Sequence, residues 1–134
     1  MTHRLPIRVY YEDTDLAGIV YYANYLRFIE RGRTEALRAV GIDQAALNAG
    51  DGLVFVVVRV AIDYHRPARF DDLLEVTTSI TQLRPASLGV AQAVWRGEER
   101  LVSAEVRLGV IDGAGRPARL PAQVAEALAG LADR

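Results

Sequence analysis

Three carboxylates lie close together near the start of the chain, at Glu12, Asp13 and Asp15, directly before an Ala-Gly turn and a helical pattern. The first N–H groups of a helix have no partner inside the helix and carry partial positive charge, so they can polarise a carbonyl oxygen. A thioester or ester carbonyl between Asp15 and that helix end would meet a nucleophile or base and an oxyanion site. Alternatively, the aspartates only turn the chain and cap the helix, and the residues alone favour this structural role.

Other hydrolytic sites find little support in the composition. The chain has two histidines, His3 and His65, no Cys, and three serines outside any Gly-x-Ser-x-Gly context. A Ser-His-Asp triad, a zinc site and a disulfide are therefore not expected. A calcium loop starting at Asp13 would need ligands where Ala17 and Asn24 stand. Hydrolysis would depend on a carboxylate, a water and backbone donors, with no metal and no cofactor.

The acidic stretch resembles the hotdog-fold acyl-CoA thioesterases, in particular the 4-hydroxybenzoyl-CoA thioesterase and Tol-Pal-associated (YbgC-like) branch. The resemblance extends to the C-terminal Arg-Pro and Leu-Pro pairs and so covers nearly the whole chain. The matching residues are Tyr11-Glu12-Asp13-Thr14-Asp15, Gly18-Ile19-Val20-Tyr21, Asn24-Tyr25, Glu30-Arg31-Gly32-Arg33-Thr34-Glu35, residues 63–72, Arg116-Pro117 and Leu120-Pro121.

The resemblance implies roles for individual residues. Asp15 matches the catalytic aspartate, which acts as nucleophile or as general base, and the N–H of Tyr22 matches the donor that polarises the thioester carbonyl. Gly18, Ile19 and Val20 are expected to contact the substrate. Tol-Pal-associated members usually carry His where this chain has Tyr22, so we expect a mixed or broader acyl specificity.

Further side chains have a functional and a structural interpretation. His65 either lines the substrate entrance or is a buried structural histidine bonded near Asp63. Some hotdog thioesterases place their catalytic carboxylate on the helix, where Glu30 and Glu35 lie here, but surface ion pairing is favoured for both. Guanidinium groups suit the phosphates of coenzyme A, although any single one could be a solvated surface residue. The candidates are Arg66, Arg69, Arg84, Arg116 and Arg119.

The apolar periodicity predicts one long helix and five strands. The helix covers 24–40, with Asn24 as N-cap, and packs its stripe, including Gly32, on a sheet. In the strand 53–65, Val54, Val56, Val58, Val60, Ile62 and Tyr64 should form one face, and in 87–96 the face of Gly89, Ala91 and Ala93 should receive the helix. The other predicted elements are strands 5–11, 73–83 and 101–111 and a C-terminal helix 121–131. The fold class is α+β: a hotdog fold in which an antiparallel sheet wraps around one helix.

The whole chain has the properties of one ordinary globular domain, 1–134. Its 134 residues are 51% hydrophobic and 25% charged, with a net charge of -1, so no nucleic-acid partner is expected. The longest apolar run, 53–58, is too short to cross a bilayer and no signal peptide is visible, which favours a cytoplasmic protein without integral membrane association. Apolar strand faces favour a homo-oligomer, either a dimer or a dimer of dimers (homotetramer), with the active site between subunits.

These observations predict a thioesterase that hydrolyses acyl-CoA, with short-chain aliphatic or aromatic acyl groups, to the free acid and coenzyme A. The rival hypothesis is a catalytically weak hotdog subunit that binds acyl-CoA or an acyl carrier, or docks on an envelope-associated complex. A hotdog dehydratase is a third possibility, but its His-based site has no counterpart near the acidic loop. Release of free thiol separates the first two.

Overall fold

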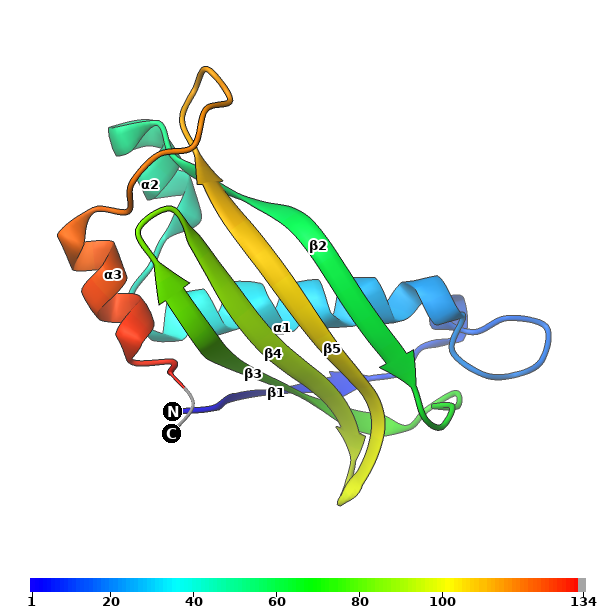
Figure 1. The fold of residues 1–134 in the computed structure, drawn as a ribbon. Helices are drawn as coiled ribbons and strands as arrows, with labels where there is room; N and C mark the ends of the chain where they lie inside the picture. Colours follow the sequence, from blue (N-terminus) through cyan, green and yellow to red (C-terminus); the bar gives the residue numbers. More distant parts are fainter. Residues whose placement is uncertain (133–134) are drawn as a thin grey trace.

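A five-stranded antiparallel sheet, in the order β1-β3-β4-β5-β2, curls against one long helix in the computed structural model, which describes residues 1–132 (Figure 1). The predicted α+β architecture is confirmed. The elements are β1 (His3–Arg8), the 3-10 turns η1 (Tyr11–Asp13) and η2 (Tyr22–Asn24), α1 (Tyr25–Ala39), α2 (Gln44–Asp51), β2 (Val54–Tyr64), β3 (Leu73–Arg84), β4 (Ser87–Arg96), β5 (Glu99–Ile111) and α3 (Ala122–Ala129).

Helix α1 packs against one face of the sheet and contributes a stripe of buried side chains to the core. Its buried stripe contains Phe28, Ile29, Gly32 and Ala36, at the three- and four-residue spacing that the sequence shows. It packs mainly on β1 and β3. A Cβ added at Gly32 would lie 2.5 Å from the Val76 Cγ1 on β3, so glycine permits the close approach of helix and sheet.

Strand β2 differs from its predicted single apolar face. Its register with β5 shifts between Val57 and Arg59, so the alternation of side chains reverses at that β-bulge. Val57 and Val60 line a cleft on the α1 side, whereas Val56 and Val58 lie over Gly109 on the other side. The predicted continuous stripe is wrong because a bulge depends on the partner strand, which a single-strand pattern does not reveal.

The small side chains of β4 also lie on the opposite face from the one predicted. Ala91 and Ala93 line a cavity on the outer face of the sheet, while the alternating Val90 and Val94 are buried beneath α1. The closest neighbours of Gly32 come from β3 instead.

The short helix α2 was not predicted. Asp43 caps it by accepting a hydrogen bond from the Ala46 N–H at 3.1 Å, and Gly52 ends it in the left-handed region at φ 69°. These two residues are the signals that sequence reasoning missed. Helices α2 and α3 lie at the end of the sheet away from the loop that precedes α1 (Figure 1).

Candidate active site

Asp15 lies in a tight loop between the paired residues Thr14 and Val20. The Asp15 N–H donates to the Ile19 carbonyl at 2.9 Å, and the Gly18 N–H donates to the Asp15 carbonyl at 2.9 Å. Gly18 has φ 78°, a conformation that favours glycine. One carboxylate oxygen of Asp15 accepts the Ala17 N–H at 2.9 Å. The Asp15 side chain therefore stabilises the turn, as the structural interpretation predicts. It is also exposed to solvent.

Asp13, by contrast, is buried and holds this region together. Its carboxylate accepts the Tyr10 N–H at 2.8 Å and the Asn24 side-chain amide at 2.7 Å. Its carbonyl accepts the Tyr21 N–H at 2.9 Å. Asn24 was predicted to cap α1 with its side chain, but that side chain bonds Asp13 instead. One carboxylate ties the loop that carries Asp15 to the turn that leads into α1.

Tyr22 begins the 3-10 turn η2, which leads directly into α1 at Tyr25. The helix N-terminus that was predicted to bind an oxyanion is therefore this 3-10 turn. Within residues 1–132 the Tyr22 N–H has no hydrogen-bond acceptor, which leaves it available to a ligand. The Tyr64 hydroxyl donates to the Tyr22 carbonyl at 3.0 Å, and the two rings lie 6.2 Å apart. Partial burial raises the pKa of the Tyr64 phenol, so it stays a neutral donor at neutral pH. Sequence reasoning missed this contact, which joins residues 42 positions apart.

The segment 66–72, between β2 and β3, holds the end of the acidic loop in place through backbone hydrogen bonds. The Val20 N–H donates to the Ala68 carbonyl at 2.9 Å, and Ile19 pairs with Arg69. The buried Tyr25 hydroxyl at the start of α1 accepts the Ala68 N–H at 3.0 Å. Burial raises the pKa of the Tyr25 phenol. Gly18, Ile19 and Val20 are thus placed by a segment remote in sequence.

An ionic cluster anchors segment 66–72 in turn. Arg96 donates to Asp72 at 2.7 Å and to Glu99, which also pairs with Arg66 at 3.2 Å. Burial by itself would raise the pKa of the Asp72 carboxyl, but hydrogen bonds from the Arg69 N–H and from Arg96 outweigh it, and the pKa is lowered. The cluster is partly exposed, so it fixes geometry more than it adds stability.

The structure separates the remaining predicted site residues. The His65 ring is exposed and bonds Ser103 at 2.9 Å, on the outer face of the sheet, so it is neither buried nor paired with Asp63. Arg66 and Arg69 lie at the end of the sheet that holds the acidic loop. The other three candidates lie near the opposite end, at the β3–β4 turn and after β5: Arg84, Arg116 and Arg119. On the helix, Glu35 pairs with Arg38 as predicted, while Glu30 lines a cleft.

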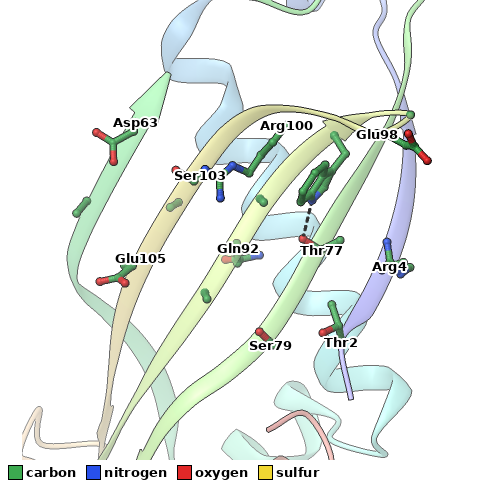
Figure 2. Close-up of a pocket in the computed structure, with 16 residues that line it drawn as sticks. Thr2, Arg4, Asp63, Thr77, Ser79, Gln92, Glu98, Arg100, Ser103 and Glu105 are labelled. Atoms are coloured by element: carbon green, nitrogen blue, oxygen red, sulfur yellow. Dashed lines mark hydrogen bonds between the residues drawn. The ribbon is translucent and has the colours of Figure 1, made fainter. Parts of the chain in front are cut away.

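Two cavities lie on opposite faces of the sheet. The larger, about 830 Å³, is an open depression on the outer face, lined by small and polar side chains such as Thr77, Ser79 and Ser103 (Figure 2). None of the residues predicted for the active site lines it. The smaller cleft, about 440 Å³, runs along α1 from Leu26 and faces β2 and β5. It begins at Leu26, the second residue of α1 and two residues after the end of η2.

In the described part of the chain, no three His, Asp or Glu side chains gather as a metal site would require. No helix among residues 1–132 is long and apolar enough to cross a membrane.

A curled antiparallel sheet around one long helix is the hotdog fold, and the sequence pattern of the thioesterase superfamily matches residues 17–103. The chain belongs to this superfamily. It is 46% identical over 110 residues to the acyl-CoA thioester hydrolase YbgC of Escherichia coli O6:H1, covering 81% of each chain. It is 42% identical to the acyl-CoA thioesterase YbgC of Haemophilus influenzae, covering 89% of this chain and 88% of that one. The crystal structure of a probable thioesterase from Bartonella henselae superposes with a TM-score of 0.87 at 42% identity, over 90% of this chain and 100% of that chain.

Proposed function

We propose that this chain hydrolyses acyl-CoA thioesters to the free acid and coenzyme A, with the Asp15 carboxylate and the Tyr22 N–H as the reacting groups. The relatives that carry this activity in their names match most of the chain. The observation that supports the residue roles is the Asp13 linkage. It joins the exposed Asp15 loop to the turn whose first N–H has no acceptor within residues 1–132.

The proposed chemistry needs only these two groups and a water. The thioester oxygen accepts the Tyr22 N–H, which stabilises the negative charge that develops on it. With Asp15 as base, the carboxylate takes a proton from water while the water oxygen bonds to the carbonyl carbon. The C–S bond then breaks, and the coenzyme A thiolate receives the proton. With Asp15 as nucleophile, its carboxylate oxygen bonds to the carbonyl carbon, the C–S bond breaks and the coenzyme A thiolate leaves, which gives a mixed anhydride. Water then hydrolyses the anhydride to the free acid and the Asp15 carboxylate, and the thiolate takes up the proton that is released.

The acyl group would occupy the cleft along α1. Its walls are mainly apolar, with Leu26, Ile29 and Leu37 from the helix and Phe55 and Val57 from β2. Burial of apolar surface would favour aliphatic or aromatic acyl groups there. Because the inner face of β2 forms one wall at the edge of the sheet, a second subunit could complete the cleft.

Thiol release from acyl-CoA tests the proposal directly. Asp15→Asn keeps the shape but removes the charge, and turnover should fall about a hundredfold or more. Glu12→Gln is the matched control, since Glu12 is exposed in the same loop, and it should retain turnover. If the wild type binds acyl-CoA without releasing thiol, the chain is the weak binding subunit of the rival hypothesis.

For coenzyme A, the cation that we propose is Arg69. It lies beside Ile19, and guanidinium groups bind phosphate through paired hydrogen bonds. Arg69→Met should raise KM for acyl-CoA but not for an acyl-pantetheine thioester, which lacks the nucleotide phosphates. Arg116→Met, near the other end of the sheet, is the control. An equal rise in KM for both substrates would assign Arg69 to the support of the loop instead.

We further propose that two copies associate through β2. This edge strand leaves Val57, Val58 and Val60 38–58% exposed, and an exposed apolar edge is a template for strand pairing. Val58→Lys should weaken the dimer in sedimentation experiments. A fully active wild-type monomer would contradict an active site shared between subunits.

A further inference from the structure

Arg33 extends from the middle of α1 towards the sheet and is held there by Gln92. One guanidinium nitrogen donates to the Gln92 Oε1 at 3.0 Å. The Gln92 amide nitrogen donates to the Ile29 carbonyl at 2.7 Å and to the Thr78 hydroxyl at 2.9 Å. Because both of those partners accept from the amide nitrogen, the amide oxygen must face Arg33. Gln92 is only 3% exposed, so this network fixes the guanidinium from a rigid part of the core.

Arg33 forms no ion pair within the described residues. By contrast, Arg96 contacts two carboxylates, Asp72 and Glu99. Burial lowers the pKa of Arg33, and Glu30 one turn away opposes that effect. The Glu30 carboxylate lines the same cleft but forms no ion pair with Arg33 within residues 1–132, so the partly buried guanidinium hydrogen-bonds a neutral amide and has N–H groups left for an anionic ligand.

Arg33 lines the cleft that we assign to the acyl group. A guanidinium has five N–H donors in a planar fork, and the bond to Gln92 uses one. Arg33 lies seven residues beyond Leu26, which is about 10 Å along the helix axis. The thioester would lie near the Leu26 end, beside η2. The cleft is mainly apolar, although Glu30, Thr34 and Gln44 also line it. Arg33 therefore stands in this cleft at a distance suited to the far end of an acyl chain.

We propose that Arg33 is a specificity-determining residue that selects acyl groups ending in a carboxylate, that is, thioesters of dicarboxylic acids with coenzyme A. This inference rests on the proposed thioesterase function and deepens it. A carboxylate can accept two N–H groups of the fork, and charge-assisted bonds of this kind are roughly twice as strong as neutral ones. The apolar side chains around the cleft would contact the methylene groups between the two ends.

The test compares thiol release from adipyl-, suberyl- and sebacyl-CoA with release from hexanoyl-, octanoyl- and decanoyl-CoA. In the wild type, kcat/KM for at least one carboxylate-ended substrate should exceed that of its alkyl counterpart by about tenfold or more. Arg33→Gln retains a donor for Gln92 but removes the charge, and should abolish this ratio. Arg33→Lys should restore part of it. Arg31→Gln is the matched control, because Arg31 is exposed on the same helix and lies outside the lining of the cleft; it should leave the ratio unchanged.

The outcomes separate this inference from the function on which it rests. Absence of thiol release from every substrate would overturn the proposed function itself. Hydrolysis of alkyl substrates without a preference for carboxylate ends would overturn only the role of Arg33. Dissociation of the oligomer in Arg33→Gln, seen by sedimentation, would also overturn it, since the counterion would then come from a second copy of the chain.

Discussion

Removal of the Asp13 carboxylate should destabilise the fold and disarrange the site at the same time. Asp13→Ala leaves the Tyr10 N–H and the Asn24 amide without their shared acceptor, which the wild type places at 2.8 and 2.7 Å. Hydrogen bonds to a charged group contribute about 1.5–3 kcal/mol each. Water can enter this surface loop and recover part of that, so we expect a loss of about 2–4 kcal/mol of unfolding free energy.

Urea denaturation at fixed protein concentration measures this loss. With m about 2 kcal/mol/M, in the usual range for a small protein, the midpoint should fall by roughly 1–2 M. Asp13→Asn keeps one acceptor oxygen but presents its NH₂ group to a second donor, so it should lie between the wild type and Asp13→Ala. Thiol release should fall in both variants, because the Asp15 loop and the Tyr22 turn are no longer tied together.

A double-mutant cycle isolates the bond between Asp13 and Asn24. If the linkage holds the site together, Asp13→Ala and Asn24→Ala should be coupled by about 1 kcal/mol or more. An unchanged urea midpoint in Asp13→Ala, or additive effects in the cycle, would refute the reasoning. Asp51→Asn, at an exposed position on α2, controls for the loss of one negative charge.

Three further changes test the packing, the oxyanion donor and the ionic cluster. Gly32→Ala should lower thermal stability, because overpacking against Val76 costs about 1–3 kcal/mol and exceeds the gain in helix propensity of roughly 1 kcal/mol. Tyr22→Phe should keep turnover within roughly tenfold, since the backbone donor remains, while Tyr22→His should change the ranking of aromatic and aliphatic substrates. Because the pKa of Asp72 is lowered in the folded state, its carboxylate stabilises the fold, and this stabilisation is complete above the ordinary Asp pKa of 3.8. The stabilisation is lost as the pH falls from 3.8 towards the folded-state pKa. Asp72→Asn should therefore have a lower unfolding free energy than the wild type at neutral pH, and the two values should converge below the folded-state pKa of Asp72.

Each change has a control or a contradicting result. Gly50→Ala, where an added Cβ meets nothing within 4 Å, should not lower stability, and equal melting temperatures for the two glycine variants would contradict the close-approach argument. Loss of all activity in Tyr22→Phe with an intact circular dichroism spectrum would show that the phenol takes part in the reaction. A constant difference between Asp72→Asn and the wild type down to acid pH would assign that effect to packing.

Local periodicity determined which segments form the main elements of this protein. The three- and four-residue spacing of Phe28, Ile29, Gly32 and Ala36 specifies the face of α1 that is buried, and β4 agrees with its predicted bounds, Ser87–Arg96. These features follow from interactions between near neighbours, which any single sequence displays. The resemblance of the acidic stretch likewise indicated the superfamily, which the comparison confirms.

Tertiary structure alone decided which faces meet and which distant groups touch. The bulge after Val57 reverses the sides of β2, because pairing with β5 sets the register. The Arg33–Gln92 bond joins residues 59 positions apart, and the bond between Asp13 and Asn24 spans a loop whose path is set by segment 66–72. A sequence records the preferences of each residue for its neighbours along the chain, but contacts across the sheet exist only once helix and strands have packed. The candidate site is made of such contacts, so the sequence can nominate Asp15 and Tyr22 but not the geometry around them.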